Sequence, residues 1–201
     1  MNCGPLVISS SRVSLRTQLT DNCHPNDCRH SLIYRWNMFR KEGNSSHFRW
    51  IHLADLATYS STKVESKNLV LKPLTLTPGF EYRLTVDVLS LDHARGWAEY
   101  VFETSVAPSG GTCNATQIQK GALATVLNIT CEGWIDKDEP LMYEFYRKLK
   151  DGTFNMLSYG ASPHGVVRLP PAADQVVVDL KVVVLDVLGT ASEVFLQMQV
   201  R

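Results

Sequence analysis

The chain has 201 residues with 20 basic and 20 acidic side chains, so its formal net charge is zero. Phosphate binding needs a basic surplus, and this balance argues against nucleic acid as a partner. A hydrophobic content of 44% suffices for packed cores, and the length fits one large domain or two small ones. No run of about 20 apolar residues is present to span a membrane. The first residues, MNCGPLVISSSR, lack the features of a signal peptide.

Five cysteines point to an oxidising compartment. Cys23 and Cys28 enclose HPND, a turn-forming tetrapeptide that can bring two sulfurs together. Cys113 and Cys131 begin and end a predicted strand–turn–strand segment, and we expect both pairs to form disulfides. Cys3 is then free or pairs outside this sequence. Two alternatives stay open: free buried cysteines in a cytosolic protein, and a zinc site, for which CHPNDC lacks a second Cys/His pair.

Three N-x-S/T sequons also favour an extracellular protein over a cytosolic one. They start at Asn44, Asn114 and Asn128. Asn128 alternates with the apolar residues around it, so its side chain is predicted on the outer face of a strand. We expect Asn44 and Asn128 to carry glycans, whereas folding around Cys113 competes with modification at Asn114.

Apolar and polar residues alternate with a period of two along most of the chain, which predicts strands rather than helices. In the first half, YRWNMF places Trp36 in the middle of a strand, where it fits a tryptophan filling the core between two sheets. The stretch LTPGFEYRLTV has Leu76, Gly79 and Tyr82 at the spacing of a tyrosine corner. We assign Trp36 and Tyr82 to structure and not to a ligand site.

The segment 131–146, CEGWIDKDEPLMYEFY, joins two predicted strands of the second half. Tyr143 and Phe145 share one face of the second strand, and both are predicted core residues. Trp134 is predicted to anchor the connection against the core. Asp136 and Asp138 form a D-x-D pair of the kind that binds calcium, but no second acidic cluster lies nearby in the sequence. We therefore predict a solvated turn and no metal, with a calcium site as the alternative.

The chain repeats itself. Residues 82–106 align without a gap on residues 176–200, at an offset of 94, and YRWNMFRK resembles YEFYRKLK of the second half. Each copy has about the length of one β-sandwich. We predict two domains, residues 1–106 and 107–201, joined by a short linker at Pro108–Gly111.

The second half resembles a known family. A cysteine followed by G-W, D-x-D and P-L-x-Y-x-F is similar to the signature of the receptor-for-egg-jelly (REJ) module of the polycystin-1 family. The stretches GGTC before it and LSYGASP and LPPAADQVVVDLKVVVLDVLG after it agree. Over residues 1–106 the resemblance rests on YRW and L-x-P-G-x-x-Y. It implies tandem β-sandwiches of fibronectin-III or immunoglobulin type, the second of them the REJ-type one.

The resemblance also implies a place in a very large membrane-anchored glycoprotein on the extracellular side of the cell membrane, at the ciliary or sperm surface. Its implied partners are other domains of the same receptor, an extracellular protein or glycan ligand, and, through the full-length protein, a channel subunit of the polycystin-2 type. The implied role is ligand binding, adhesion or force transmission in a channel complex that acts in calcium signalling.

No catalytic motif is present: G-x-S-x-G, a P-loop and H-E-x-x-H are all missing. We expect a non-catalytic protein without a cofactor. Two other readings stay open. An accessory carbohydrate-binding module would present an exposed aromatic platform, for which Trp50 and Trp97 are the candidates. A cytokine-receptor-like tandem would place its binding loops at the elbow near residues 107–112.

Overall fold

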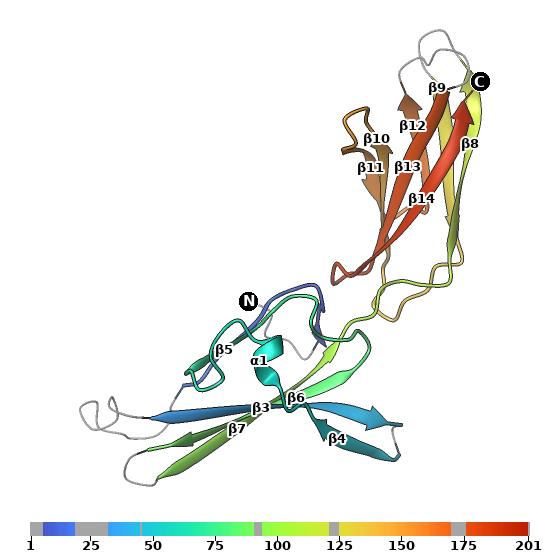
Figure 1. Cartoon of the computed structure of the whole chain (residues 1–201). Helices are drawn as coiled ribbons and strands as arrows, with labels where there is room; N and C mark the ends of the chain where they lie inside the picture. The colour runs from blue at the N-terminus through green and yellow to red at the C-terminus, as the bar shows by residue number, and fades with distance from the viewer. Residues whose placement is uncertain are drawn as a thin grey trace. The chain divides into compact units, whose positions relative to one another are not determined.

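The computed structural model of the chain describes residues 6–18, 32–44, 46–90, 94–120, 125–169 and 176–200. The chain divides into two compact units, Met1–Ser105 (unit 1) and Val106–Arg201 (unit 2), and the division lies one residue before the predicted one. Strands dominate both units (Figure 1), and the all-β prediction is confirmed. The described residues contain no helix with the length and hydropathy of a membrane span.

Unit 1 contains a five-stranded and a two-stranded sheet, with the orders β1-β7-β6-β3-β4 and β2-β5. A single helical turn, α1 (Leu56–Tyr59), precedes β5, and no helical period in the sequence indicated it. The strands are β1 (Leu6–Val7), β2 (Val13–Arg16), β3 (Ile33–Gly43), β4 (Phe48–His52), β5 (Asn68–Leu71), β6 (Glu81–Leu89) and β7 (Arg95–Thr104).

Unit 2 contains a four-stranded sheet, β11-β10-β13-β14, and a three-stranded sheet, β12-β9-β8. The strands are β8 (Thr112–Lys120), β9 (Thr125–Glu132), β10 (Met142–Lys148), β11 (Phe154–Gly160), β12 (His164–Leu169), β13 (Val176–Leu185) and β14 (Ala191–Val200). Pairing within both sheets is antiparallel.

Each unit buries one core between its two sheets, as a β-sandwich does. In unit 2 the ring of Phe145 on β10 lies so close to Gly165 on β12 that a Cβ at Gly165 would stand 2.9 Å from it. Only glycine leaves room for the ring there. The alternating apolar residues form the two cores, with Val13, Trp36, Met38, Leu69, Leu71, Tyr82 and Leu84 in unit 1, and Leu127, Ile129, Cys131, Tyr143, Phe145, Leu180 and Val182 in unit 2.

The repeat is real, but its predicted offset is wrong by two residues. Leu89 pairs with Arg95 at the end of the β6–β7 hairpin, and Leu185 pairs with Ala191 at the end of the β13–β14 hairpin. The two hairpins therefore correspond at an offset of 96 and not 94. Sliding a strand by two residues leaves every side chain on its own face, so an alignment of apolar positions cannot detect the error.

The first and last strands of each unit run in the same direction. In unit 1, β1 pairs with β7 in parallel, and Ser105 N–H donates to the carbonyl of Val7 at 2.9 Å. In unit 2, β8 lies beside β14 and runs the same way (Figure 1). The chain therefore enters and leaves each sandwich at opposite ends.

The predicted linker is part of unit 2. Ser109 and Ile135 exchange two backbone hydrogen bonds of 3.0 Å, and the Ser192 hydroxyl donates to the carbonyl of Pro108 at 2.6 Å. Cys3, Cys23 and Cys28, with the disulfide expected between the last two, lie outside the described residues.

Candidate functional site

The connection between β9 and β10, residues 133–141, is fixed at its start by a disulfide. Cys113 and Cys131 lie directly opposite each other on β8 and β9, and their sulfurs are bonded at 2.06 Å. Both are buried, with 4% and 2% of their surface exposed. The bond joins two neighbouring strands of one sheet, rather than the two sheets.

Trp134 lies half-buried on this corner. Its ring covers Gly111, and a Cβ at Gly111 would overlap three ring atoms. It packs against the core cluster that contains Phe145 and Cys131. The indole Nε1 is buried without a hydrogen-bond partner among the described residues, so the contacts that the structure shows for this ring are packing contacts.

The two acids of the D-x-D pair meet a third from a distant part of the chain. Asp138 N–H donates to Oδ1 of Asp136 at 2.8 Å, which closes the local turn. Asp186, at the end of β13, brings a carboxylate oxygen to within 4.8 Å of oxygens of both Asp136 and Asp138. Sequence reasoning missed Asp186. The signal for it was a single acid at the end of the apolar run of β13, directly before the hairpin turn.

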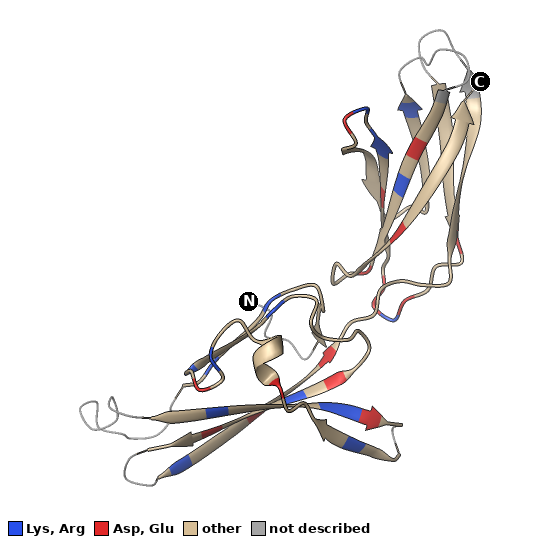
Figure 2. Ribbon diagram, viewed as in Figure 1, with Lys and Arg blue, Asp and Glu red and all other residues tan. Residues whose placement is uncertain are grey.

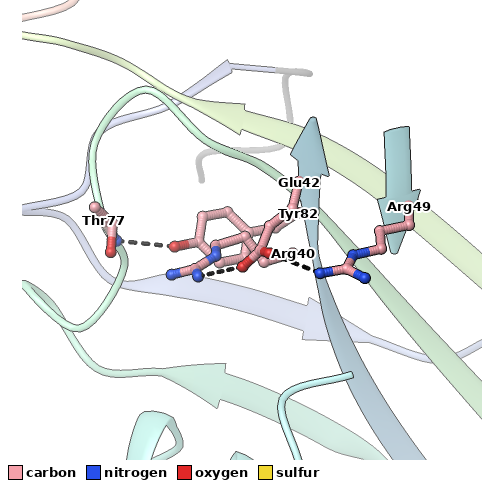
Figure 3. A network of polar contacts seen from close by, with 5 residues as sticks. All are labelled: Arg40, Glu42, Arg49, Thr77 and Tyr82. Atoms are coloured by element: carbon pink, nitrogen blue, oxygen red, sulfur yellow. Dashed lines mark hydrogen bonds and ion pairs between the residues drawn. The ribbon is translucent and has the colours of Figure 1, made fainter. Parts of the chain in front are cut away.

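Unit 1 is stabilised by a tyrosine corner at the start of β6. Thr77 N–H donates to the hydroxyl oxygen of Tyr82 at 2.9 Å, which is the bond of a tyrosine corner (Figure 3). Leu76 is buried and Gly79 has a positive φ of 78°, as the turn requires. The Thr104 hydroxyl donates to the carbonyl of Thr77 at 2.7 Å and so holds the same corner from β7.

A charged pair lies beside this corner. The Arg40 guanidinium donates to Glu42 at 2.6 Å, and Arg49 approaches the same carboxylate at 4.0 Å (Figure 3). The hydrogen bond to Glu42 raises the pKa of Arg40 above its ordinary value. Arg40 also stands 4.8 Å from the centre of the Phe80 ring. These contacts link β3 to the edge strand β4, and Arg40 Nε is buried without a hydrogen-bond partner among the described residues.

The predicted core aromatics all lie in or against the cores. Trp36 is 7% exposed, and its Nε1 donates to the carbonyl of Ser66 at 2.9 Å. Tyr82, Tyr143 and Phe145 are buried, with 1%, 7% and 1% of their surface exposed. Burial raises the pKa of the Tyr143 hydroxyl.

The three sequon asparagines fall on two surfaces. Asn44 is exposed at the β3–β4 turn, where its Oδ1 accepts from His47 N–H at 2.8 Å. Asn114 is exposed and Asn128 half-buried, and they lie on the outer face of the three-stranded sheet, because Asn114 pairs with Thr130. Both asparagines of unit 2 therefore project from the same sheet.

The opposite face of unit 2, on the four-stranded sheet, carries exposed apolar side chains. Phe195 is 64% exposed, Tyr159 59% and Met156 47%. Lys181 lies between the rings of Tyr146 and Phe154, at 5.0 and 4.9 Å from their centres. Burial, followed by a hydrogen bond to Glu144, raises the pKa of Tyr146 to about 12.

A carbohydrate-binding module would need an exposed aromatic platform, and the two candidate residues, Trp50 and Trp97, differ in their exposure. The Trp50 ring is covered by the Arg83 guanidinium at 4.8 Å. Trp97 is 74% exposed on β7. Figure 2 shows basic and acidic residues interspersed on both units.

Solved structures similar to this chain include two crystal structures. A crystal structure of chicken CNTN1 FN1-FN3 domains matches 98% of this chain at 10% identity, with a TM-score of 0.43. The chain spans 65% of the length of that structure. A crystal structure of murine CEACAM1b matches 98% of this chain and 95% of its own length, at 10% identity and a TM-score of 0.35.

The comparison with protein families covers both units. The family model of the REJ domain matches residues 1–201 and so extends over unit 1, where the sequence motifs are fewest. The chain belongs to the REJ domain family.

Proposed function

We propose that this chain is a non-catalytic extracellular module of a polycystin-1-family receptor, and that its two units are tandem fibronectin-III-like sandwiches that bear load. REJ family membership supports the receptor assignment. The buried disulfide and the surface sequons support an extracellular location. The outer-face sequons and the Cys113–Cys131 bond predict a glycoprotein that matures in the secretory pathway.

The observation that carries the load-bearing role is the parallel arrangement of first and last strands in both units. A pull on the two ends of such a unit acts along the strands, so the contacts between the terminal strands must break together. In unit 1 these are the β1–β7 hydrogen bonds, including Ser105 to Val7. Pulling a hairpin open breaks the bonds one at a time and needs less force.

Single-molecule pulling tests this role. The chain pulled through its termini should unfold at clearly higher force than the same chain pulled between Gly152, in the β10–β11 turn, and the C-terminus. Val7→Pro should weaken unit 1 only, because proline fixes φ and removes a backbone donor in β1. Unfolding forces that do not depend on the pulling direction would count against the load-bearing role, and would leave the receptor assignment standing.

The disulfide gives the pulling experiment a known change in the extended length of unit 2. It locks the residues between Cys113 and Cys131, a sequence separation of 18, against extension. Reduction should lengthen the extended unit 2 by about 60 Å, at roughly 3.3–3.6 Å per residue. Reduction of the predicted Cys23–Cys28 bond would lengthen unit 1 by only about 17 Å at the same length per residue. The two increments can therefore be told apart.

Intact-mass analysis of chain secreted from mammalian cells tests the compartment. Glycosidase treatment should remove mass from Asn44 and Asn128. An unmodified, fully reduced protein would contradict the extracellular assignment.

A second role, ligand contact, is favoured by the exposed side chains on the four-stranded sheet of unit 2, which face away from the Asn114 and Asn128 sequons. The double substitution Phe195→Asn with Gln197→Thr creates a sequon there. Beads coated with the chain should aggregate if the face is homophilic, and the added glycan should abolish aggregation. A glycan array is the matching assay for the carbohydrate-binding alternative, with Trp97→Ala as its variant.

A further inference from the structure

We propose that Asp136, Asp138 and Asp186 form a calcium site in unit 2, at the end of the sandwich where the chain enters it. The three residues come from the β9–β10 connection and from the turn after β13. Their carboxylate oxygens lie within 4.8 Å of one another. This replaces the solvated turn that the sequence predicted for Asp136 and Asp138.

Asp186 carries the proposal. It is 3% exposed, and its two carboxylate oxygens have different surroundings. Oδ1 accepts backbone hydrogen bonds from Leu188 at 2.9 Å and Thr190 at 2.8 Å. Oδ2 is buried and has no hydrogen-bond partner among the described residues. A buried carboxylate oxygen without a partner is costly, and a bound cation removes the cost.

The hairpin turn does not require this carboxylate. At the corresponding place in unit 1, Ser90 occupies the position of Asp186, and its hydroxyl accepts from Ala94 N–H at 3.2 Å. The backbone bonds match as well: Ser90 N–H donates to Ala94 at 2.9 Å, and Asp186 N–H to Thr190 at 3.0 Å. A neutral acceptor therefore suffices for the turn, and the charge on Asp186 needs another explanation.

Asp138 repeats the pattern of Asp186. Its Oδ2 is also buried and without a hydrogen-bond partner. Asp136 Oδ1 accepts from the backbone N–H of Asp138, which places the Asp136 carboxylate in the cluster. Three carboxylates gathered in a partly buried place repel one another, and a divalent cation converts that repulsion into attraction.

The ligand chemistry favours calcium. All three donors are carboxylate oxygens, which suit hard cations, whereas zinc prefers the nitrogen and sulfur ligands that this cluster lacks. Calcium binds oxygens at about 2.3–2.6 Å, so two of its ligands can stand up to about 5 Å apart. Magnesium needs a tighter octahedron and seldom uses more than two carboxylates. Backbone carbonyls and water would complete the calcium shell.

The site joins segments that the backbone already brings together. Val187 N–H donates to the carbonyl of Asp138 at 3.2 Å, which connects the two acidic turns directly. Between Trp134 and Asp136, Ile135 pairs with Ser109 at the start of unit 2. An ion bound here would hold the β9–β10 connection, the β13–β14 turn and the first residues of unit 2 in one place.

Thermal unfolding of the whole chain in chelator and in calcium tests the site, with peptide-resolved hydrogen exchange to assign each transition to its unit. Extracellular modules with few charged ligands bind calcium at roughly 10⁻⁴–10⁻³ M. At about 2 mM calcium, the folding equilibrium constant of unit 2 should rise roughly 3- to 20-fold, and its Tm by about 3–10 °C. The Tm of unit 1 should not change.

Asparagine variants separate an ion site from a structural turn. Asp186→Asn keeps the Oδ1 acceptor, and Asp136→Asn with Asp138→Asn keeps the local turn. Both variants should lose the calcium response and, in chelator, should be at least as stable as the unsubstituted chain, because the repulsion is gone. Asp151→Asn is the matched control: this exposed acid closes the β10–β11 turn through Thr153 N–H at 2.9 Å, outside the cluster. It should keep the full response.

Direct binding completes the test. Calorimetric titration should give one calcium site per chain, and the same concentration of magnesium should give a much smaller shift in Tm. Terbium should show luminescence sensitised by Trp134, which lies two residues from Asp136. A chain whose unit 2 shows no calcium shift up to about 10 mM, or a shift that survives in both asparagine variants, would overturn the proposal.

Discussion

The two units place an aromatic ring at the same position and hold the surrounding sandwich by different means. Trp36 pairs with Val86 in unit 1, and Phe145 pairs with Val182 in unit 2, at corresponding registers of the two large sheets. Unit 1 adds a tyrosine corner at Tyr82. Unit 2 has Val178 at that place and cannot form the corner.

Unit 2 instead has a covalent bond between β8 and β9 and three acids at one end. The comparison shows that the shared part of the repeat is the apolar core, where side-chain volume and face are constrained. The braces lie at the ends of the strands, where a hydrogen bond, a disulfide or an ion can each fix a turn. Within the described residues, unit 2 therefore contains the redox-sensitive bond and, on our proposal, a calcium-sensitive turn, whereas the predicted Cys23–Cys28 bond of unit 1 lies outside them.

The largest loss of stability is expected when the central aromatic side chain of a unit, Trp36 or Phe145, is replaced. Trp36→Ala and Phe145→Ala should each cost roughly 3–5 kcal/mol. Each loss should appear only in the unit that contains the substitution, measured by peptide-resolved hydrogen exchange along a denaturant series. Ile33→Ala and Val177→Ala, at exposed positions, are the controls. Equal loss of protection in both units would show one cooperative domain.

Loss of the disulfide should have the next largest effect. Cys113→Ala with Cys131→Ala opens a loop of 18 residues and should cost unit 2 roughly 3 kcal/mol. Adding a reductant to the unsubstituted chain should lower the Tm of unit 2 in the same way. A reductant that leaves the Tm of unit 2 unchanged would mean that the bond is absent or carries no stability.

The contact between Trp134 and Gly111 predicts an intermediate effect. Gly111→Ala places a methyl group on the indole ring and should cost about 1–3 kcal/mol in unit 2. Gly96→Ala, where no atom lies within 4 Å, should cost far less. In a chain that already carries Trp134→Ala, the cost of Gly111→Ala should largely vanish. A double-mutant cycle on the free energy of unfolding measures this coupling, and additive costs would refute the contact.

The tyrosine corner should give the smallest effect. Tyr82→Phe removes the acceptor of Thr77 N–H and should cost unit 1 about 0.5–1.5 kcal/mol. Tyr159→Phe alters an exposed hydroxyl in unit 2 and serves as the matched control. If chemical denaturation gives the two substitutions equal costs, the corner hydrogen bond does not brace unit 1.

Much of the fold could be predicted from the sequence, because apolar and polar residues alternate along a strand that has one buried and one exposed face. The alternation along β6, β9 and β13 predicted an all-β chain, and the motif that began at Cys131 predicted the REJ family. The same alternation misplaced the repeat by two residues, because every apolar position still fell on an apolar position. The predicted linker also proved to be part of unit 2, since backbone pairing between Ser109 and Ile135 leaves no trace in composition.

The sequence by itself determined the all-β class of the fold and the family, because these depend on local periodicity and on a contiguous motif. Only the tertiary structure decided what Asp136 and Asp138 face. Asp186 reads in the sequence as one acid ending an apolar strand. The pairing of β10 with β13 brings it to the β9–β10 connection, and burial then leaves its Oδ2 without a partner. A site built from segments far apart in the chain forms only when the strands pair in their native register.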